Sequence, residues 1–211
     1  MSGCCGHESV VFDDMSTRYR RILWFVIAVN AVMFGVETLA GHQADSQALK
    51  ADALDFLADS VTYGISLWAI GKADRTRALA ALGKGISLAV MGLWVLGSTG
   101  YQVLILGVPD ATTMGAVGLL ACAANLLSVV LLVRYKDGDA NVRSVWLCSR
   151  NDALGNLGVV AAAGLVFFTT SGIPDLVVAG AMAGLFCWSA TEIIRKALGE
   201  LRASGDNRAA A

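Results

Sequence analysis

Long apolar stretches alternate with short polar segments along the whole chain of 211 residues. A helix that crosses a membrane needs about 20 mostly apolar residues to span about 30 Å of hydrocarbon. Six stretches satisfy this requirement: residues 22–41, 52–71, 85–106, 114–133, 144–168 and 175–194. The connections between them are too short to hold a folded domain. The pattern therefore predicts an all-α membrane protein with six transmembrane helices.

Basic residues are concentrated in every second connection. They are Arg18, Arg20 and Arg21; Lys72, Arg75, Arg77 and Lys84; Arg134, Lys136 and Arg143; and Arg195, Lys196, Arg202 and Arg208. The opposite connections carry Lys50 alone. Because Lys and Arg favour the cytoplasmic side, both termini are expected in the cytoplasm. We expect a leader over 1–17, a transmembrane domain over 18–196 and a short, frayed cytoplasmic tail over 197–211.

Composition supports the membrane prediction and disfavours other classes. The chain is 56% hydrophobic and 16% charged, whereas soluble domains carry about a quarter charged residues. A net charge of −1 provides no basic field for nucleic acid. The five cysteines are an odd number, and several lie inside apolar stretches, unlike the framework of a small disulfide-bonded scaffold. A soluble enzyme, a nucleic-acid-binding protein and a secreted scaffold are all disfavoured.

Acidic residues inside apolar stretches point to function, because a carboxylate within a bilayer is costly. The second stretch begins DALDFLAD, which places Asp52, Asp55 and Asp59 on one stripe of a helix. Asp55 and Asp59 are too deep to cap that helix. Asp52 opens the stretch, so it has two readings: an N-cap carboxylate, or a gate along a pathway.

The fifth stretch carries a second pair of ligand-type residues, Cys148 and Asp152, four residues apart in CSRNDALGN. If the two stripes meet, Asp55 and Asp59 complete a set of three carboxylates and one thiolate. Four such ligands suit tetrahedral zinc, and the thiolate favours borderline or soft ions over Mg²⁺ and Ca²⁺. No catalytic array or H-E-x-x-H helix accompanies the set. The sequence thus predicts a transported metal, with no permanently bound cofactor.

Other polar residues have weaker or divided signals. Asn30 and Glu37 in the first stretch either line a pathway or hydrogen-bond within the bundle, and Asn156 either supports Asp152 or packs. In the leader, the soft ligands Cys4, Cys5 and His7 are candidates for capturing metal in the cytoplasm. Gly180 and Gly184, four residues apart, form a close-packing motif that serves either the bundle or a homodimer through membrane helices.

Four segments carry a family resemblance: NAVMFGVE, GHQADSQALKADALDFLADS, ANVRSVWLCSRNDALGN and GIPDLVVA. They resemble the cation diffusion facilitator family of divalent-metal/proton antiporters, over residues 18–196. The resemblance implies that the transport ligands fall on Asp55, Asp59, Cys148 and Asp152. Zinc-type members commonly have His where this chain has Cys148, which makes Cd²⁺ a natural competitor. It also implies a short form, without the cytoplasmic C-terminal domain of many members.

The expected function is therefore efflux of Zn²⁺ and Cd²⁺ in exchange for protons by alternating access, in a bacterial cytoplasmic membrane. Its partners would be the metal ion, protons and lipid, and it would be a secondary active transporter rather than an enzyme. Two alternatives stay open. One is efflux of another soft or borderline metal such as Co, Ni, Cu or Hg. The other is a metal-binding heterodimer subunit that does not itself transport.

Overall fold

The structure is a computed structural model that describes residues 17–68, 74–105, 107–135 and 140–209. Within these ranges, the side chains of residues 66, 74, 105, 135, 140–148 and 203–209 lie outside the described part. The leader cluster of Cys4, Cys5 and His7 also lies outside it. All elements in the described ranges are helical.

Six long helices coincide with the six predicted stretches. They are α1 (Thr17–Gln43), α2 (Gln47–Trp68), α3 (Asp74–Ile105), α4 (Ala111–Leu132), α5 (Ala140–Thr169) and α6 (Ile173–Ala209), with a 3₁₀ turn, η1 (Val133–Tyr135), after α4. Among the described residues, all of these helices except α2 are long and apolar enough to cross a membrane on composition alone. α2 falls short because of its acidic residues. The predicted all-α membrane fold is confirmed, and the chain is a multi-pass integral membrane protein.

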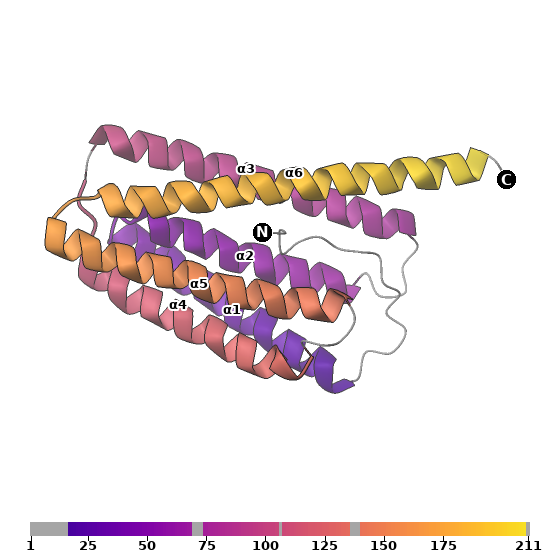
Figure 1. Ribbon diagram of the computed structural model, residues 1–211, viewed down its shortest axis with the longest axis horizontal. Helices are drawn as coiled ribbons and strands as arrows, with labels where there is room; N and C mark the ends of the chain where they lie inside the picture. The colour runs from indigo at the N-terminus through magenta and orange to yellow at the C-terminus, as the bar shows by residue number, and fades with distance from the viewer. Residues whose placement is uncertain (1–16, 69–73, 106, 136–139, 210–211) are drawn as a thin grey trace.

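The helices form two groups (Figure 1). α3 and α6 run side by side, and α1, α2, α4 and α5 form the other layer. The most extensive helix–helix contacts are between α3 and α6, between α4 and α5, and between α1 and α2. α2 also contacts α3, α5 and α6. The helix that carries the acidic stripe is therefore packed against helices of both groups, which shields its carboxylates from lipid.

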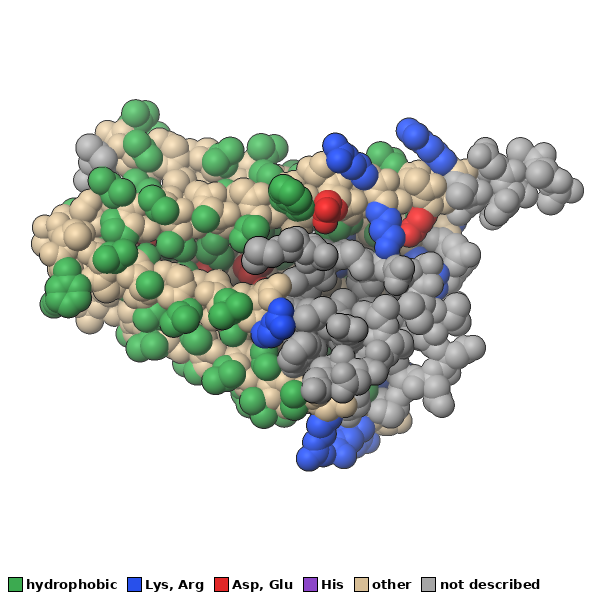
Figure 2. All heavy atoms as spheres, in the orientation of Figure 1, with side chains coloured by type: hydrophobic (Ala, Val, Ile, Leu, Met, Phe, Trp, Pro, Cys, Tyr) green, Lys and Arg blue, Asp and Glu red, His purple; other side chains and the backbone are tan. Residues whose placement is uncertain are grey.

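The helix contacts bury apolar residues together with a few small and polar ones. α1 buries residues at alternating spacings of four and three: Tyr19, Leu23, Val26, Asn30, Met33, Glu37 and Ala40. α4 does the same with Met114, Gly118, Ala121, Asn125, Ser128 and Leu132. This spacing is typical of helices that pack at shallow angles. Large apolar side chains such as Trp24 and Leu39 face outward, and Figure 2 shows them scattered over the surface that lipid would cover.

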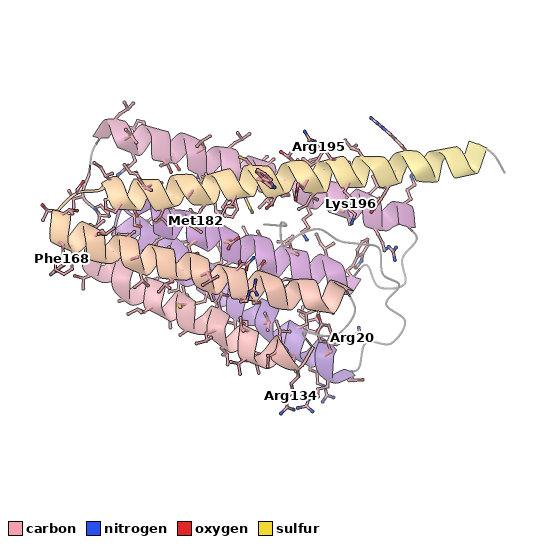
Figure 3. The ribbon with its side chains drawn as sticks, viewed as in Figure 1. Arg20, Arg134, Phe168, Met182, Arg195 and Lys196 are labelled. Carbon is pink, nitrogen blue, oxygen red and sulfur yellow. The ribbon has the colours of Figure 1, made fainter. Side chains whose placement is uncertain are left out.

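Basic side chains gather at one end of the bundle (Figures 2 and 3). Arg20, Arg134, Arg195 and Lys196 lie toward this end, and Phe168 lies at the opposite end. The structure thus brings together basic residues from α1, η1 and α6. By the positive-inside rule, this end faces the cytoplasm.

Close approach between α3 and α6 depends on glycines of α3. A Cβ on Gly85 would lie 2.8 Å from Cγ1 of Ile194, and a Cβ on Gly92 would lie 2.8 Å from Sγ of Cys187. By contrast, a Cβ on Gly180 or Gly184 would meet nothing within 4 Å in the described part of the chain. The close-packing motif of α6 is therefore not used within this bundle.

The first turn of α2 is capped by a carboxylate from α6. Asp175 Oδ2 accepts a hydrogen bond from the backbone N–H of Gln47 at 2.8 Å, and Oδ1 accepts from Ala48 N–H at 3.1 Å and from the Ser46 hydroxyl at 2.6 Å. Ser46 Oγ in turn accepts from Leu49 N–H at 3.1 Å. The first N–H groups of a helix lack partners within it, so this contact satisfies them at a buried position.

Two predicted boundaries are corrected. α2 begins at Gln47, with Ser46 and Asp175 as its cap, so Asp52 lies in the second turn and the N-cap reading of Asp52 is wrong. The predicted fraying after the sixth stretch is also wrong, because α6 continues to Ala209. Residues 195–202 include Leu198 and Leu201 beside their charged residues, which suits a helix that leaves the membrane without ending.

Replacing Asp175 by Ala is expected to destabilise the fold by about 1–3 kcal/mol, because buried donors lose their acceptor. Thermal unfolding of the detergent-solubilised protein measures the effect. Asp110 is a matched control: it caps α4 through Thr112 and Thr113 but is exposed. The Thr113 hydroxyl and N–H hold the pKa of Asp110 below its usual range. Water can replace an exposed cap, so Asp110→Ala should shift the midpoint less; equal shifts would contradict the structural role of Asp175.

Candidate metal-transport site

Two predicted ligands from different helices meet in the structure. Asp59 is on α2 and Asp152 is on α5, and the two helices are in contact. The side chains of Asp59 and Asp152 come within hydrogen-bonding range of each other. Both are half-buried. Figure 2 shows acidic side chains recessed between the two helical layers, below the apolar outer surface.

Asp59 has two further neighbours that sequence reasoning missed. The hydroxyl of Tyr63, one turn later on α2, donates a hydrogen bond of 2.6 Å to Asp59 Oδ2. Lys84 of α3 lies within coulombic range of the same carboxylate. The spacing of four residues between Asp59 and Tyr63 was visible in the sequence. Lys84 lies near Asp59 only because α3 packs against α2, so no local sequence pattern predicts this contact.

The structure shows less about the surroundings of the other two predicted ligands, Asp55 and Cys148. Asp55 is half-buried on α2, one turn before Asp59. The backbone of Cys148 belongs to α5, one turn before Asp152, but its side chain lies outside the described residues. Among the side chains that are described, no three His, Cys, Asp or Glu are arranged to hold one ion. The four-ligand site therefore stays a prediction.

A second acidic pair lies between α1 and α2. Glu37 is fully buried, at 0% exposure, and faces Asp52, which is 1% exposed. Asp55 lies within coulombic range of Glu37. Neither oxygen of Glu37 has a hydrogen-bond partner among the described residues, and Asp52 Oδ2 also has none there. Glu37 and Asp52 come within hydrogen-bonding range of each other, so both readings of Glu37, pathway lining and hydrogen bonding within the bundle, stay predictions.

Two buried amides accompany these carboxylates. Asn156 follows Asp152 by one turn on α5 and has 0% exposure. Neither its amide oxygen nor its nitrogen finds a hydrogen-bond partner within the described ranges. Asn30 on α1, two turns before Glu37, is 1% exposed, and its Oδ1 is also without a partner there. Buried polar groups are normally satisfied, so these orphaned atoms call for a solvent molecule or an ion.

Comparison with known families decides the class of the protein. Residues 23–202 match the family model of the cation efflux transmembrane domain. The chain belongs to this family. This confirms the resemblance to the cation diffusion facilitator family.

The chain is also similar to several curated metal-transport proteins. The metal cation efflux system protein CzcD of Cupriavidus metallidurans is 28% identical over 188 residues, which cover 83% of this chain and 59% of the relative. The cadmium, cobalt and zinc/H(+)-K(+) antiporter of Bacillus velezensis is 26% identical over 151 residues, or 63% of this chain and 47% of the relative. This cation efflux chain thus spans about half of the length of such relatives.

Proposed function

We propose that the protein moves divalent transition-metal ions, Zn²⁺ and Cd²⁺ first, out of the cytoplasm in exchange for protons. The observation that carries the proposal is the meeting of Asp59 and Asp152 from two packed membrane helices. Membership of the cation efflux family supports it, as do relatives named for cation efflux and for cadmium, cobalt and zinc antiport. Those relatives are bacterial, which suits a bacterial cytoplasmic membrane.

The proposed ion site consists of Asp55, Asp59, Cys148 and Asp152. Each helix contributes two residues four positions apart, which places them about one turn apart on the same face. A tetrahedral set of this size suits Zn²⁺. The thiolate of Cys148 adds a preference for softer ions, which makes Cd²⁺ a good substrate as well. The metal is a substrate here and not a resident cofactor.

Exchange for protons follows from the same carboxylates. Two carboxylates this close repel each other unless a proton or a cation lies between them. A metal ion binds the deprotonated groups and releases their protons, so the site holds one or the other. If the helices rock to open the site to each side in turn, the two fluxes are coupled. An inward proton gradient then drives metal outward.

Tyr63 and Lys84 would adjust this site without binding the ion. The Tyr63 hydroxyl holds Asp59 in one orientation, as an outer hydrogen bond often does for a metal ligand. The positive charge of Lys84 offsets part of the negative charge of Asp59 when no ion is present. Capture of metal by Cys4, Cys5 and His7, and a homodimer through the open Gly180 face, stay predictions.

Transport should depend on a proton gradient. In proteoliposomes that contain the purified protein, an imposed pH gradient should accelerate Zn²⁺ movement toward the more acidic side. The reason is that protons leaving that compartment exchange for the metal that enters it. Zn²⁺ flux is measured with a fluorescent indicator, and an ionophore that collapses the gradient is the control. Zn²⁺ flux that is indifferent to the gradient would exclude antiport while leaving metal transport intact.

A further inference from the structure

The facing carboxylates of Glu37 and Asp52 are not explained by the transport site. Asp52 lies two turns from Asp59 along α2, or roughly 10 Å at 1.5 Å per residue. It lies nearer the first turn of α2, at the end of the bundle opposite the basic side chains. Glu37 comes from a different helix, α1, and is aimed at the acidic stripe of α2.

No positive charge in the described part of the chain pairs with these two carboxylates. The two carboxylates come within hydrogen-bonding range of each other, but neither takes part in an ion pair there, and no described residue donates a hydrogen bond to either oxygen of Glu37 or to Asp52 Oδ2. The further charge that acts on Glu37 is Asp55, which is also negative. Buried charges are normally paired or coordinate a metal, because an isolated carboxylate is expensive to desolvate. A buried pair with this charge balance has the chemistry of a cation site.

We propose that Glu37 and Asp52 form a second, exit-side binding station for the divalent cation, between the site at Asp59 and the non-cytoplasmic end of the bundle. This station rests on the proposed function, since the ion reaches it from the four-ligand site. Its facing carboxylates, from two packed helices, can enclose an ion together. Buried carboxylates with open coordination positions are the observation that carries it.

The two proposed sites differ in their ligand atoms, and the difference favours release of the ion at the exit. The proposed inner site includes the Cys148 thiolate, whereas the Glu37–Asp52 station offers oxygen alone. Oxygen ligands bind Zn²⁺ and Cd²⁺ less well than sulfur does, because these ions are borderline or soft. Passage through a membrane protein requires sites that bind well enough to admit an ion and weakly enough to release it. A weaker station near the exit meets the second condition.

Cd²⁺ binding to the full chain in lipid nanodiscs tests the station. The double variant Asp59→Asn/Asp152→Asn disables the inner site, and equilibrium dialysis counts the ions that stay bound. We expect this variant to retain one weakly bound Cd²⁺ whose X-ray absorption spectrum shows oxygen neighbours and no sulfur. Adding Glu37→Gln should abolish that ion. Adding Glu192→Gln, which changes an exposed carboxylate of α6 in the same way, should leave it bound.

Several outcomes overturn the station. They are a double variant that binds no ion, a residual ion that survives Glu37→Gln, and a residual ion that is also lost with Glu192→Gln. A carboxylic acid infrared band that Glu37→Gln removes, without a second ion, would assign the pair to a proton instead. Wild-type protein that transports Cd²⁺ while its double variant binds none overturns the station alone. Wild-type protein that binds no divalent ion overturns the proposed function as well.

A folding control keeps the result interpretable. Glu37→Gln removes an uncompensated buried charge, so its thermal unfolding midpoint in metal-free buffer should equal or exceed that of the wild type. Should this variant fail to fold, Asp52→Asn removes the opposite carboxylate of the same station. It should then cause the same loss of the residual ion; retention of that ion would contradict the proposal.

Discussion

Replacing Asp59 by Asn is expected to reduce Zn²⁺ transport by about 100-fold or more, since even the outer partners of a metal ligand are worth about 10- to 100-fold. The amide keeps the size of the side chain and can still accept the hydrogen bond from Tyr63. It loses the negative charge that binds the ion and the group that carries the proton. Zn²⁺ uptake into inside-out vesicles measures the loss, normalised to protein amount.

Companion variants separate this effect from damage to the fold. Asp152→Asn should be as defective as Asp59→Asn, because the two carboxylates face each other across α2 and α5. Tyr63→Phe should keep part of the activity, because it removes only the donor that orients Asp59. Asp110→Asn, an exposed carboxylate at the start of α4, should transport normally. Full activity of Asp59→Asn or of Asp152→Asn would remove that residue from the ion site.

The second large effect concerns selectivity. Cys148→His should retain Zn²⁺ transport and lose Cd²⁺ transport disproportionately, because imidazole suits zinc while the thiolate is the softer ligand. Cys148→Ser should weaken transport of both ions, since a neutral hydroxyl is a poor ligand. The quantity that discriminates is the ratio of Cd²⁺ to Zn²⁺ transport at one pH, for the His variant against the wild type.

Cys122 provides the matched control for Cys148. It is a half-buried thiol of α4 whose Sγ lies 3.8 Å from the carbonyl oxygen of Ala153 on α5, and it belongs to no proposed site. Cys122→Ser should therefore leave the Cd²⁺ to Zn²⁺ ratio unchanged. An unchanged ratio in Cys148→His, together with a fully active Cys148→Ala, would reduce the site to its three carboxylates.

Helix content and membrane topology could be read from the sequence because both depend on local composition. Apolar length alone locates α1, α3, α4, α5 and α6, and the basic connections orient them. α2 is harder to delimit, because Lys50 and Asp52 interrupt its first apolar residues, and the sequence therefore predicts its start at Asp52. The real start at Gln47 depends on Asp175, which lies far away in sequence, and a capping partner of this kind leaves no local signal.

In the candidate site, too, some features follow from local sequence and others depend on contacts between helices. Spacings of four residues on α2 and α5 are local helix geometry, so they identified Asp59 and Asp152 as residues that face a common space. Which groups surround them depends on packing between helices. Lys84 and the pairing of Glu37 with Asp52 therefore emerged only from the fold. Gly180 and Gly184 show the converse: a motif that local spacing suggests, but that the described bundle does not use.

The cap that Asp175 provides for α2 has a consequence for biosynthesis. A chain emerging from the ribosome makes α2 long before α6, and the N–H groups of Gln47 and Ala48 then lack their acceptor. α2 is also the helix least suited to lipid, because its carboxylates need neighbours on several sides. We therefore expect α2 to settle late, held near water or beside α1 until the sixth helix enters the membrane. In a Gln47→Cys variant, nascent chains that end before residue 175 should react with a water-soluble thiol probe more than the parent chain of the same length does, and the released full chain should protect the new thiol.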